Sequence, residues 1–107
     1  MAGARSVDLC AVDEVPPGTM TMTWVDGTEP VLVANVEGSI RAVSGICTHE
    51  YVELDGGFLA GRTVTCLLHT SRFDLVTGKA LDAPAYDALE VYPVTIAEGR
   101  VLIDLPG

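Results

Sequence analysis

Closely spaced turn signals constrain the fold of this chain more than any other sequence feature. Short apolar and β-branched runs lie between these turns, and helical periodicity is almost absent. The turns are PPG at 16–18, Asp26-Gly27, VEG at 36–38, TGK at 77–79 and AEG at 97–99. The predicted strands are 6–10, 21–25, 31–35, 39–43, 62–66, 72–76, 90–96 and 100–105. We therefore predict an all-β antiparallel sandwich or barrel, with hairpins across VEG and AEG and a short helix only within 12–18.

Length and charge limit the classes of function that fit this chain. With 107 residues, we expect a single domain spanning 1–107. The formal net charge of −9 argues against a nucleic-acid partner, which needs a basic surface. The chain shows no apolar run of membrane-spanning length and no secretory signal, so we expect a soluble protein in the cytoplasm.

The only two histidines each follow a cysteine closely. Cys47-x-His49 is separated from Cys66-x-x-His69 by sixteen residues, and each pair comes at a loop after a predicted strand. Thiolate and imidazole groups bind zinc, copper and iron–sulfur centres. The third cysteine, Cys10, lies in a predicted strand and is expected to be a small buried side chain.

Two kinds of metal centre agree with this ligand set. A structural zinc site would make the domain an interaction module, but zinc sites usually space their ligand pairs by two to four residues. The mixed Cys–His, Cys–His order also suits a two-iron cluster in which two histidines replace two cysteines on one iron.

The sequence resembles the Rieske-type [2Fe–2S] ferredoxins of bacterial aromatic ring-hydroxylating dioxygenase systems over nearly its whole length. Besides the ligand pattern, the resemblance rests on Phe73, Thr77-Gly78, Pro84, Leu89 to Val94, and Gly99 with Val101. The resemblance implies one [2Fe–2S] cluster per chain, held in a β-sandwich of three small sheets with a cluster-binding subdomain at one tip. Its cluster-binding loops would span about 44–54 and 65–74. Cys47 and Cys66 would bind the buried iron, and His49 and His69 would bind the outer, reducible iron.

The same resemblance implies a soluble one-electron carrier rather than an enzyme. Such a carrier takes electrons from a flavin-dependent, NAD(P)H-consuming ferredoxin reductase and passes them to a terminal Rieske non-haem iron oxygenase that dihydroxylates an aromatic substrate. We expect a monomer when free. An alternative is a Rieske redox subunit of another oxidoreductase, similar to the small subunit of nitrite reductase.

Several positions depart from the family pattern. Val52 and Leu68 stand where high-potential relatives carry cysteines, so the disulfide between the two loops cannot form. Ser71 replaces a frequent glycine and is either a small turn residue or a hydroxyl donor to the cluster. Glu50 replaces another glycine, and its charge either opposes the effect of Ser71 on the reduction potential or marks a docking face. Three apolar candidates for the rim of that face are Tyr51, Leu67 and Pro84.

Overall fold

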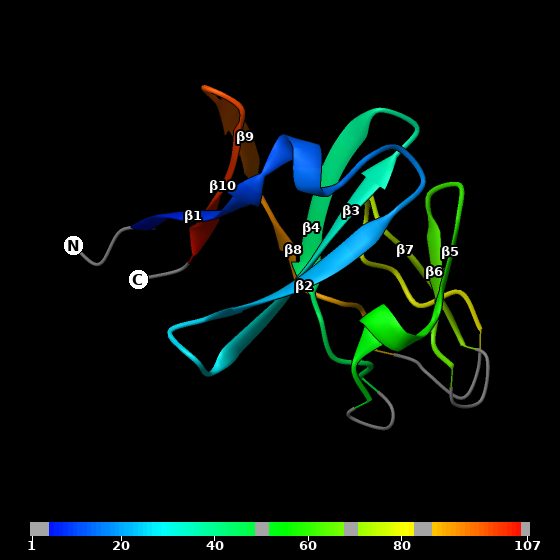
Figure 1. The fold of residues 1–107 in the computed structure, drawn as a ribbon. Coiled ribbons are helices and arrows are strands. Elements are labelled where there is room, and N and C mark those ends of the chain that lie inside the picture. The colour runs from blue at the N-terminus through cyan, green and yellow to red at the C-terminus, as the bar shows by residue number, and fades with distance from the viewer. Residues whose placement is uncertain (1–4, 49–51, 68–70, 83–86, 106–107) are drawn as a thin grey trace.

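The computed structural model describes residues 5–48, 52–67, 71–82 and 87–105. Three antiparallel sheets make up the fold (Figure 1), with strand orders β1-β10-β9, β2-β3-β4-β8 and β5-β6-β7. The strands are β1 Arg5–Ala11, β2 Met20–Val25, β3 Glu29–Val36, β4 Ser39–Ser44, β5 Phe58–Ala60, β6 Thr63–Thr65, β7 Arg72–Asp74, β8 Val91–Tyr92, β9 Val94–Ala97 and β10 Arg100–Leu105. The helical elements of the described residues are two short 3₁₀ turns, η1 Val12–Glu14 and η2 Leu54–Gly56. The predicted all-β class is confirmed, and η1 lies within the predicted range 12–18, but η2 was not predicted.

The two predicted hairpins each connect their strands by a two-residue turn. In the β3–β4 hairpin Val36 pairs with Ser39, so Glu37 and Gly38 form a two-residue turn with φ of +52° and +95°. The β9–β10 hairpin has the same form, with Ala97 paired to Arg100 around Glu98 and Gly99. Positive φ at both turn positions matches the right-handed twist of the strands. These turns therefore fix the register of both hairpins.

The predicted strand 90–96 is wrong as a single element, because Pro93 divides it. Before the proline, β8 pairs with β4 in the four-stranded sheet; after it, β9 pairs with β10 in another sheet. A proline has no N–H to give to a strand ladder. Pro93 therefore marks the point where the chain leaves one sheet for the next.

The four-stranded sheet is the middle layer of the molecule, with a hydrophobic core on each face. Along β3, alternate side chains point to opposite cores, as the two-residue period of a strand requires. The core on the side of β1, β9 and β10 contains Cys10, which is 6% exposed and whose thiol pKa is raised, chiefly by burial. The other core lies toward β5-β6-β7 and contains Cys47 and Cys66. Both cysteines that the sequence predicts as ligands therefore lie in the core between the middle sheet and the small sheet.

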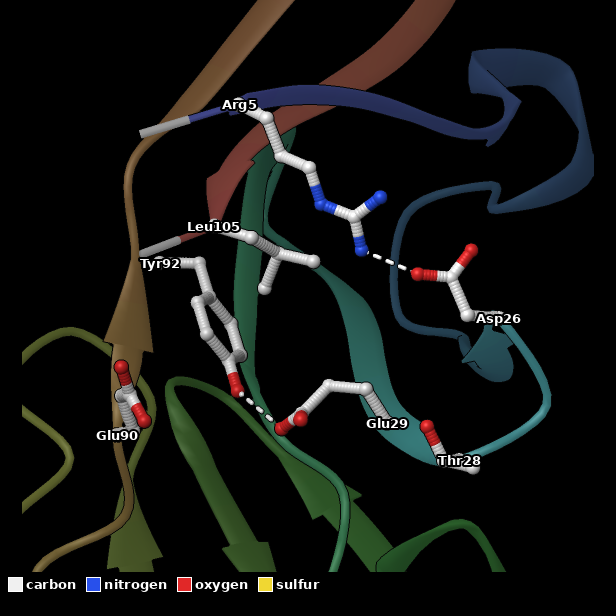
Figure 2. A pocket seen from close by; sticks show the side chains of 7 residues that line it. All are labelled: Arg5, Asp26, Thr28, Glu29, Glu90, Tyr92 and Leu105. Carbon is white, nitrogen blue, oxygen red and sulfur yellow. Dashed lines mark hydrogen bonds and ion pairs between the residues drawn. The ribbon is translucent and has the colours of Figure 1, made fainter. Parts of the chain in front are cut away.

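A polar cavity of about 220 Å³ is lined by Arg5, Asp26, Thr28, Glu29, Glu90, Tyr92 and Leu105 (Figure 2). Arg5 forms an ion pair with Asp26, and the Tyr92 hydroxyl donates a 3.2 Å hydrogen bond to Glu29. Burial raises the pKa of Tyr92, and the charges of Glu90 and Glu29 raise it further. The Arg5–Asp26 pair links β1 to the β2–β3 turn and the Tyr92–Glu29 bond links β8 to β3, so these polar groups have a structural role.

Candidate metal centre

Two hairpins of matching register begin with the two cysteines. The Cys47 N–H donates to the carbonyl of Val52 and the Cys66 N–H to the carbonyl of Ser71, each over 2.8 Å. Outside these bonds, Ile46 pairs with Glu53 and Thr65 pairs with Arg72. Each cysteine therefore holds the same place, at the first position of a six-residue loop closed five residues later.

Both cysteine side chains lie in the same hydrophobic cluster. Cys47 is 1% exposed and Cys66 is 0% exposed, and they share the cluster with Phe73 and Leu54. No disulfide joins the cysteines of the chain. Burial of the two cysteines would keep water away from an iron bound to them, and solvent access is one of the factors that set the reduction potential of a redox cluster.

A glycine explains how the first hairpin comes close to the second. At Gly57, directly after η2, a Cβ atom would lie 1.9 Å from the backbone carbonyl oxygen of Thr65, the residue before Cys66. Any side chain here would push the two segments apart. The glycine-rich stretch after Cys47 therefore has a packing role, and its Phe58–Ala60 part forms the strand β5, which the sequence did not predict.

Ser71 lies at the end of the second loop with its side chain buried. It is 1% exposed, and its Oγ atom has no hydrogen-bond partner among the described residues. An unpaired buried hydroxyl costs free energy, so such atoms usually have an explanation such as a bound group. A cluster sulfide or cysteine sulfur held by this loop would accept that hydrogen bond. The orphaned hydroxyl and the two buried thiols thus fit a sulfur-rich cluster better than an empty apolar core.

Several predicted site residues fall outside the described ranges: His49, Glu50, Tyr51, Leu68, His69 and Pro84. Within the described ranges, no three or more His, Cys, Asp or Glu side chains come together as a metal site. Leu67 is described, and its side chain is 58% exposed directly after the buried Cys66. That exposure agrees with its predicted place on an apolar rim.

Sequence reasoning missed the polar contacts that fix the chain around these loops. Asp74, which is 8% exposed, accepts hydrogen bonds from Arg62 and from the N–H groups of Val76 and Thr77. Burial raises the pKa of Asp74, but these hydrogen bonds outweigh burial and hold the pKa below its usual value. An aspartate shortly before Thr-Gly is a turn signal and could have revealed this contact.

Comparison with known proteins identifies the class that this fold and site define. The family model of the Rieske [2Fe–2S] domain matches residues 5–93. The chain belongs to this family, and the predicted cofactor, a [2Fe–2S] cluster, is confirmed.

Within the family, the similar proteins are ferredoxins. The chain is 43% identical over 99 residues to the ferredoxin component of a naphthalene 1,2-dioxygenase system of Pseudomonas aeruginosa, covering 92% of this chain and 94% of that protein. It is 41% identical to the biphenyl dioxygenase ferredoxin subunit of a Pseudomonas strain, covering 89% of this chain and 87% of the subunit.

Solved structures support the same assignment. The Sphingomonas yanoikuyae B1 ferredoxin aligns with a TM-score of 0.90 and 32% identity, covering 95% of this chain and 100% of that one. This likeness confirms the predicted three-sheet Rieske fold. The names of the relatives also confirm the resemblance to ferredoxin components of aromatic dioxygenase systems, which carry electrons and are not catalytic alone.

Proposed function

We propose that this chain carries single electrons to the terminal oxygenase of an aromatic ring-hydroxylating dioxygenase system. The observation that carries the proposal is the pair of equivalent hairpins, each starting with a buried cysteine, in a chain similar to dioxygenase ferredoxins over nearly its whole length. The whole chain, 1–107, acts as one domain, with cluster-binding loops at about 44–54 and 65–74.

Four residues would hold the cluster. Cys47 and Cys66 bind one iron, and His49 and His69 bind the other, as in the family pattern. The bound cluster supplies a centre that gains and loses one electron. The protein would contribute the two buried cysteine thiolates and the buried Ser71 hydroxyl, which would donate a hydrogen bond to a cluster sulfur.

The electron donor is a flavin-dependent, NAD(P)H-consuming ferredoxin reductase, and the acceptor is a Rieske non-haem iron oxygenase that dihydroxylates an aromatic compound. A similar structure, 29% identical with a TM-score of 0.87, is titled as a complex of reduced oxygenase and oxidised ferredoxin in carbazole 1,9a-dioxygenase. We also propose that this protein works in the cytoplasm. Among the described residues, the structure contains no helix long and apolar enough to cross a membrane.

Docking places the histidine end of the cluster against the partner. Leu67 supplies exposed apolar surface beside Cys66, and Glu50, Tyr51 and Pro84 are further candidates for this face. The alternative of a nitrite-reductase-like subunit has weaker support. The small subunit of a nitrite reductase from Mycobacterium tuberculosis is 24% identical to this chain, and a likeness at that level shows the fold alone.

Electron delivery can be tested with the reductase and oxygenase of a naphthalene dioxygenase system. Adding this protein with its cluster bound should restore NADH-dependent dihydrodiol formation in a mixture that lacks its own ferredoxin. A Leu67→Asp variant with an unchanged visible spectrum should support a lower rate, because a carboxylate interrupts the apolar rim. Failure to restore turnover with naphthalene, biphenyl and carbazole systems alike, despite a fully loaded cluster, would contradict the proposed function.

A further inference from the structure

A groove of about 610 Å³, called the β4–β9 groove below, lies where the chain passes from the middle sheet to the sheet of β1, β10 and β9. Most of its lining side chains are apolar, and an arginine joins them. The residues that carry the argument are Ile40, Arg41, Val91, Pro93, Val94 and Ile96. Ile96 is 50% exposed and Val91 is 39% exposed. Exposed apolar side chains gathered in a concave site are typical of a surface that binds another molecule.

Two strand edges border the β4–β9 groove. On this side of β4, β8 pairs only with Ala42 and Val43. The Ser44 N–H donates to the Glu90 carbonyl on the same side. Because alternate residues of a strand direct their backbone groups to the same side, the N–H and C=O of Ile40 point to the part of the edge that β8 leaves uncovered. On the other wall, β9 is the outer strand of its own sheet. The groove can therefore accept an extended chain as an added strand.

Arg41 has no counter-charge among the described residues. The other four arginines each pair with an aspartate: Arg5 with Asp26, Arg62 with Asp74, Arg72 with Asp82 and Arg100 with Asp8. The Nε atom of Arg41 is buried and has no hydrogen-bond partner in the part of the chain that the structure describes. A buried N–H without an acceptor costs free energy, so such a group needs an explanation. A carboxylate is the acceptor that a guanidinium binds best.

The register of the middle sheet determines which side chains an added strand would present. Arg41 pairs with Ala34, which belongs to the core of the two buried cysteines, whereas Ile40 packs against the opposite core. Directly opposed residues of paired strands place their side chains on the same face. A residue opposite Arg41 therefore faces the guanidinium, and its two neighbours face the side of Ile40. The groove thus fits an acidic residue between two apolar residues.

We propose that the β4–β9 groove binds an extended segment of a partner protein in which one Asp or Glu lies between two apolar residues. The carboxylate pairs with Arg41, the apolar side chains cover Ile40 and Ile96, and the backbone pairs with the edge of β4. This inference goes beyond the proposed electron transfer. The groove involves the first residues of β4, whereas Cys47 follows the end of that strand (Figure 1), so an occupied groove leaves the cysteine hairpins accessible.

Charge favours this occupant over others. A second copy of the chain, paired through the same edge, would bring two Arg41 side chains near each other, and each copy carries a net charge of −9. The same net charge would repel a partner with a broad acidic surface. A charged residue can also serve only to keep a strand edge from pairing. Such a charge extends into water, however, whereas the Arg41 Nε atom is buried.

The test titrates ¹⁵N-labelled protein, with its cluster bound, with acetyl-Thr-Val-Glu-Val-Thr-amide and follows the backbone amides by NMR. We expect saturable shifts at Ile40, Ala42 and Ile96, with a Kd of about 1 mM or below. The same peptide with glutamine in place of glutamate should bind about fivefold more weakly or worse, because the charge-assisted hydrogen bond to Arg41 is lost. A peptide with both valines N-methylated should not bind, because its backbone cannot pair with β4.

Matched variants separate the position of the charge from its amount. Arg41→Gln and Arg62→Gln each remove one positive charge, and Arg62 lies beside the small sheet with its side chain 59% exposed. Arg41→Gln should bind the glutamate peptide about fivefold more weakly and should bind the glutamine peptide as the wild type does, since the two changes remove the same contact. Arg62→Gln should bind the glutamate peptide like the wild type. The glutamine peptide tests the contact on unaltered protein if Arg41→Gln does not fold.

Several results would overturn the inference. These are an absence of saturable shifts at the groove, equal binding of the glutamate and glutamine peptides, and self-association of Arg41→Gln when the wild type binds no peptide, which would assign Arg41 to guarding the edge. Benzoate that reproduces the shifts would indicate a site for small carboxylates. Shifts of the same amides with protein concentration alone would indicate a second copy. All of these outcomes leave the visible cluster spectrum unchanged, so they are distinguishable from failure of the proposed function.

Discussion

Ser71 has a buried hydroxyl for which the described protein supplies no acceptor. If this hydroxyl donates to a cluster sulfur, the bond strengthens when the cluster gains an electron, because the sulfur becomes more negative. A gain of about 1 kcal/mol raises a one-electron potential by roughly 40 mV. Ser71→Ala should therefore lower the midpoint potential by about that amount in protein-film voltammetry, and Ser71→Gly should agree. An unchanged potential in both variants would show that Ser71 is only a small residue in the turn.

Asp74 is the buried carboxylate that organises the turn after β7. Its Arg62 contact and its two backbone N–H donors are lost in Asp74→Ala, so we expect the free energy of unfolding at neutral pH to fall by about 2 kcal/mol. Chemical denaturation followed by circular dichroism measures this change. Arg62→Gln is the control, and should cost less because both backbone donors remain satisfied.

The pKa of Asp74 gives this contribution a pH dependence. Because the folded pKa lies below the unfolded value, the stabilisation is complete above the unfolded pKa of about 4 and is lost as the pH falls through the folded pKa. The stability difference between the wild type and Asp74→Asn should thus be constant from pH 8 to 5 and shrink below about pH 4. A difference that grew on acidification would show that the folded pKa is raised.

At the scale of the element, substitutions in the turns of the β3–β4 and β9–β10 hairpins should stabilise the folded protein. Glu37 and Glu98 take positive φ values of +52° and +51°, which asparagine tolerates better than glutamate. Glu37→Asn and Glu98→Asn should each raise the free energy of unfolding by about 0.5 kcal/mol, measured by thermal melting. Glutamine at the same positions removes the same charge without the backbone preference, so an equal gain from glutamine would assign the effect to charge.

The elements that sequence predicted well are those whose signals are local. Glu37-Gly38 and Glu98-Gly99 lie between alternating apolar runs, and both hairpins are present as expected. The strand break at Pro93 was missed because β-branched and aromatic residues lie on both sides of the proline; the pairing of its two halves with different sheets reveals the break. β5 was missed because Gly56, Gly57 and Gly61 read as a loop, whereas Gly57 allows the close approach to Thr65.

At the scale of the whole molecule, the cysteine–histidine pattern can be read from spacing alone, and the ligand set stays a prediction, whereas the burial of the cysteines depends on the fold. Cys47 and Cys66 were expected at the site, and the structure buries both in one core. The hydrogen bond from the Thr48 hydroxyl to the Asp87 carbonyl could not be predicted, because it joins residues 39 positions apart in the sequence.

Because the net charge is −9, we expect the association of this protein with its electron-transfer partner to depend on salt concentration. A partner with basic surface would be attracted to this protein over long range, and salt screens that attraction. The second-order rate constant for electron transfer to the oxygenase should therefore fall by about tenfold between low and high ionic strength in stopped-flow experiments. A rate independent of salt would show that the acidic surface serves solubility and not encounter.

The split ligation of the cluster by Cys47, His49, Cys66 and His69 is the central claim. Electron–nuclear double resonance on the dithionite-reduced protein, grown with ¹⁵N-histidine, tests it directly. We predict a reduced Rieske-type signal with two strongly coupled histidine nitrogens, and the loss of one coupling or of the cluster in His49→Ser and in His69→Ser. A [2Fe–2S] signal without histidine couplings, or a colourless protein that binds zinc, would contradict the account.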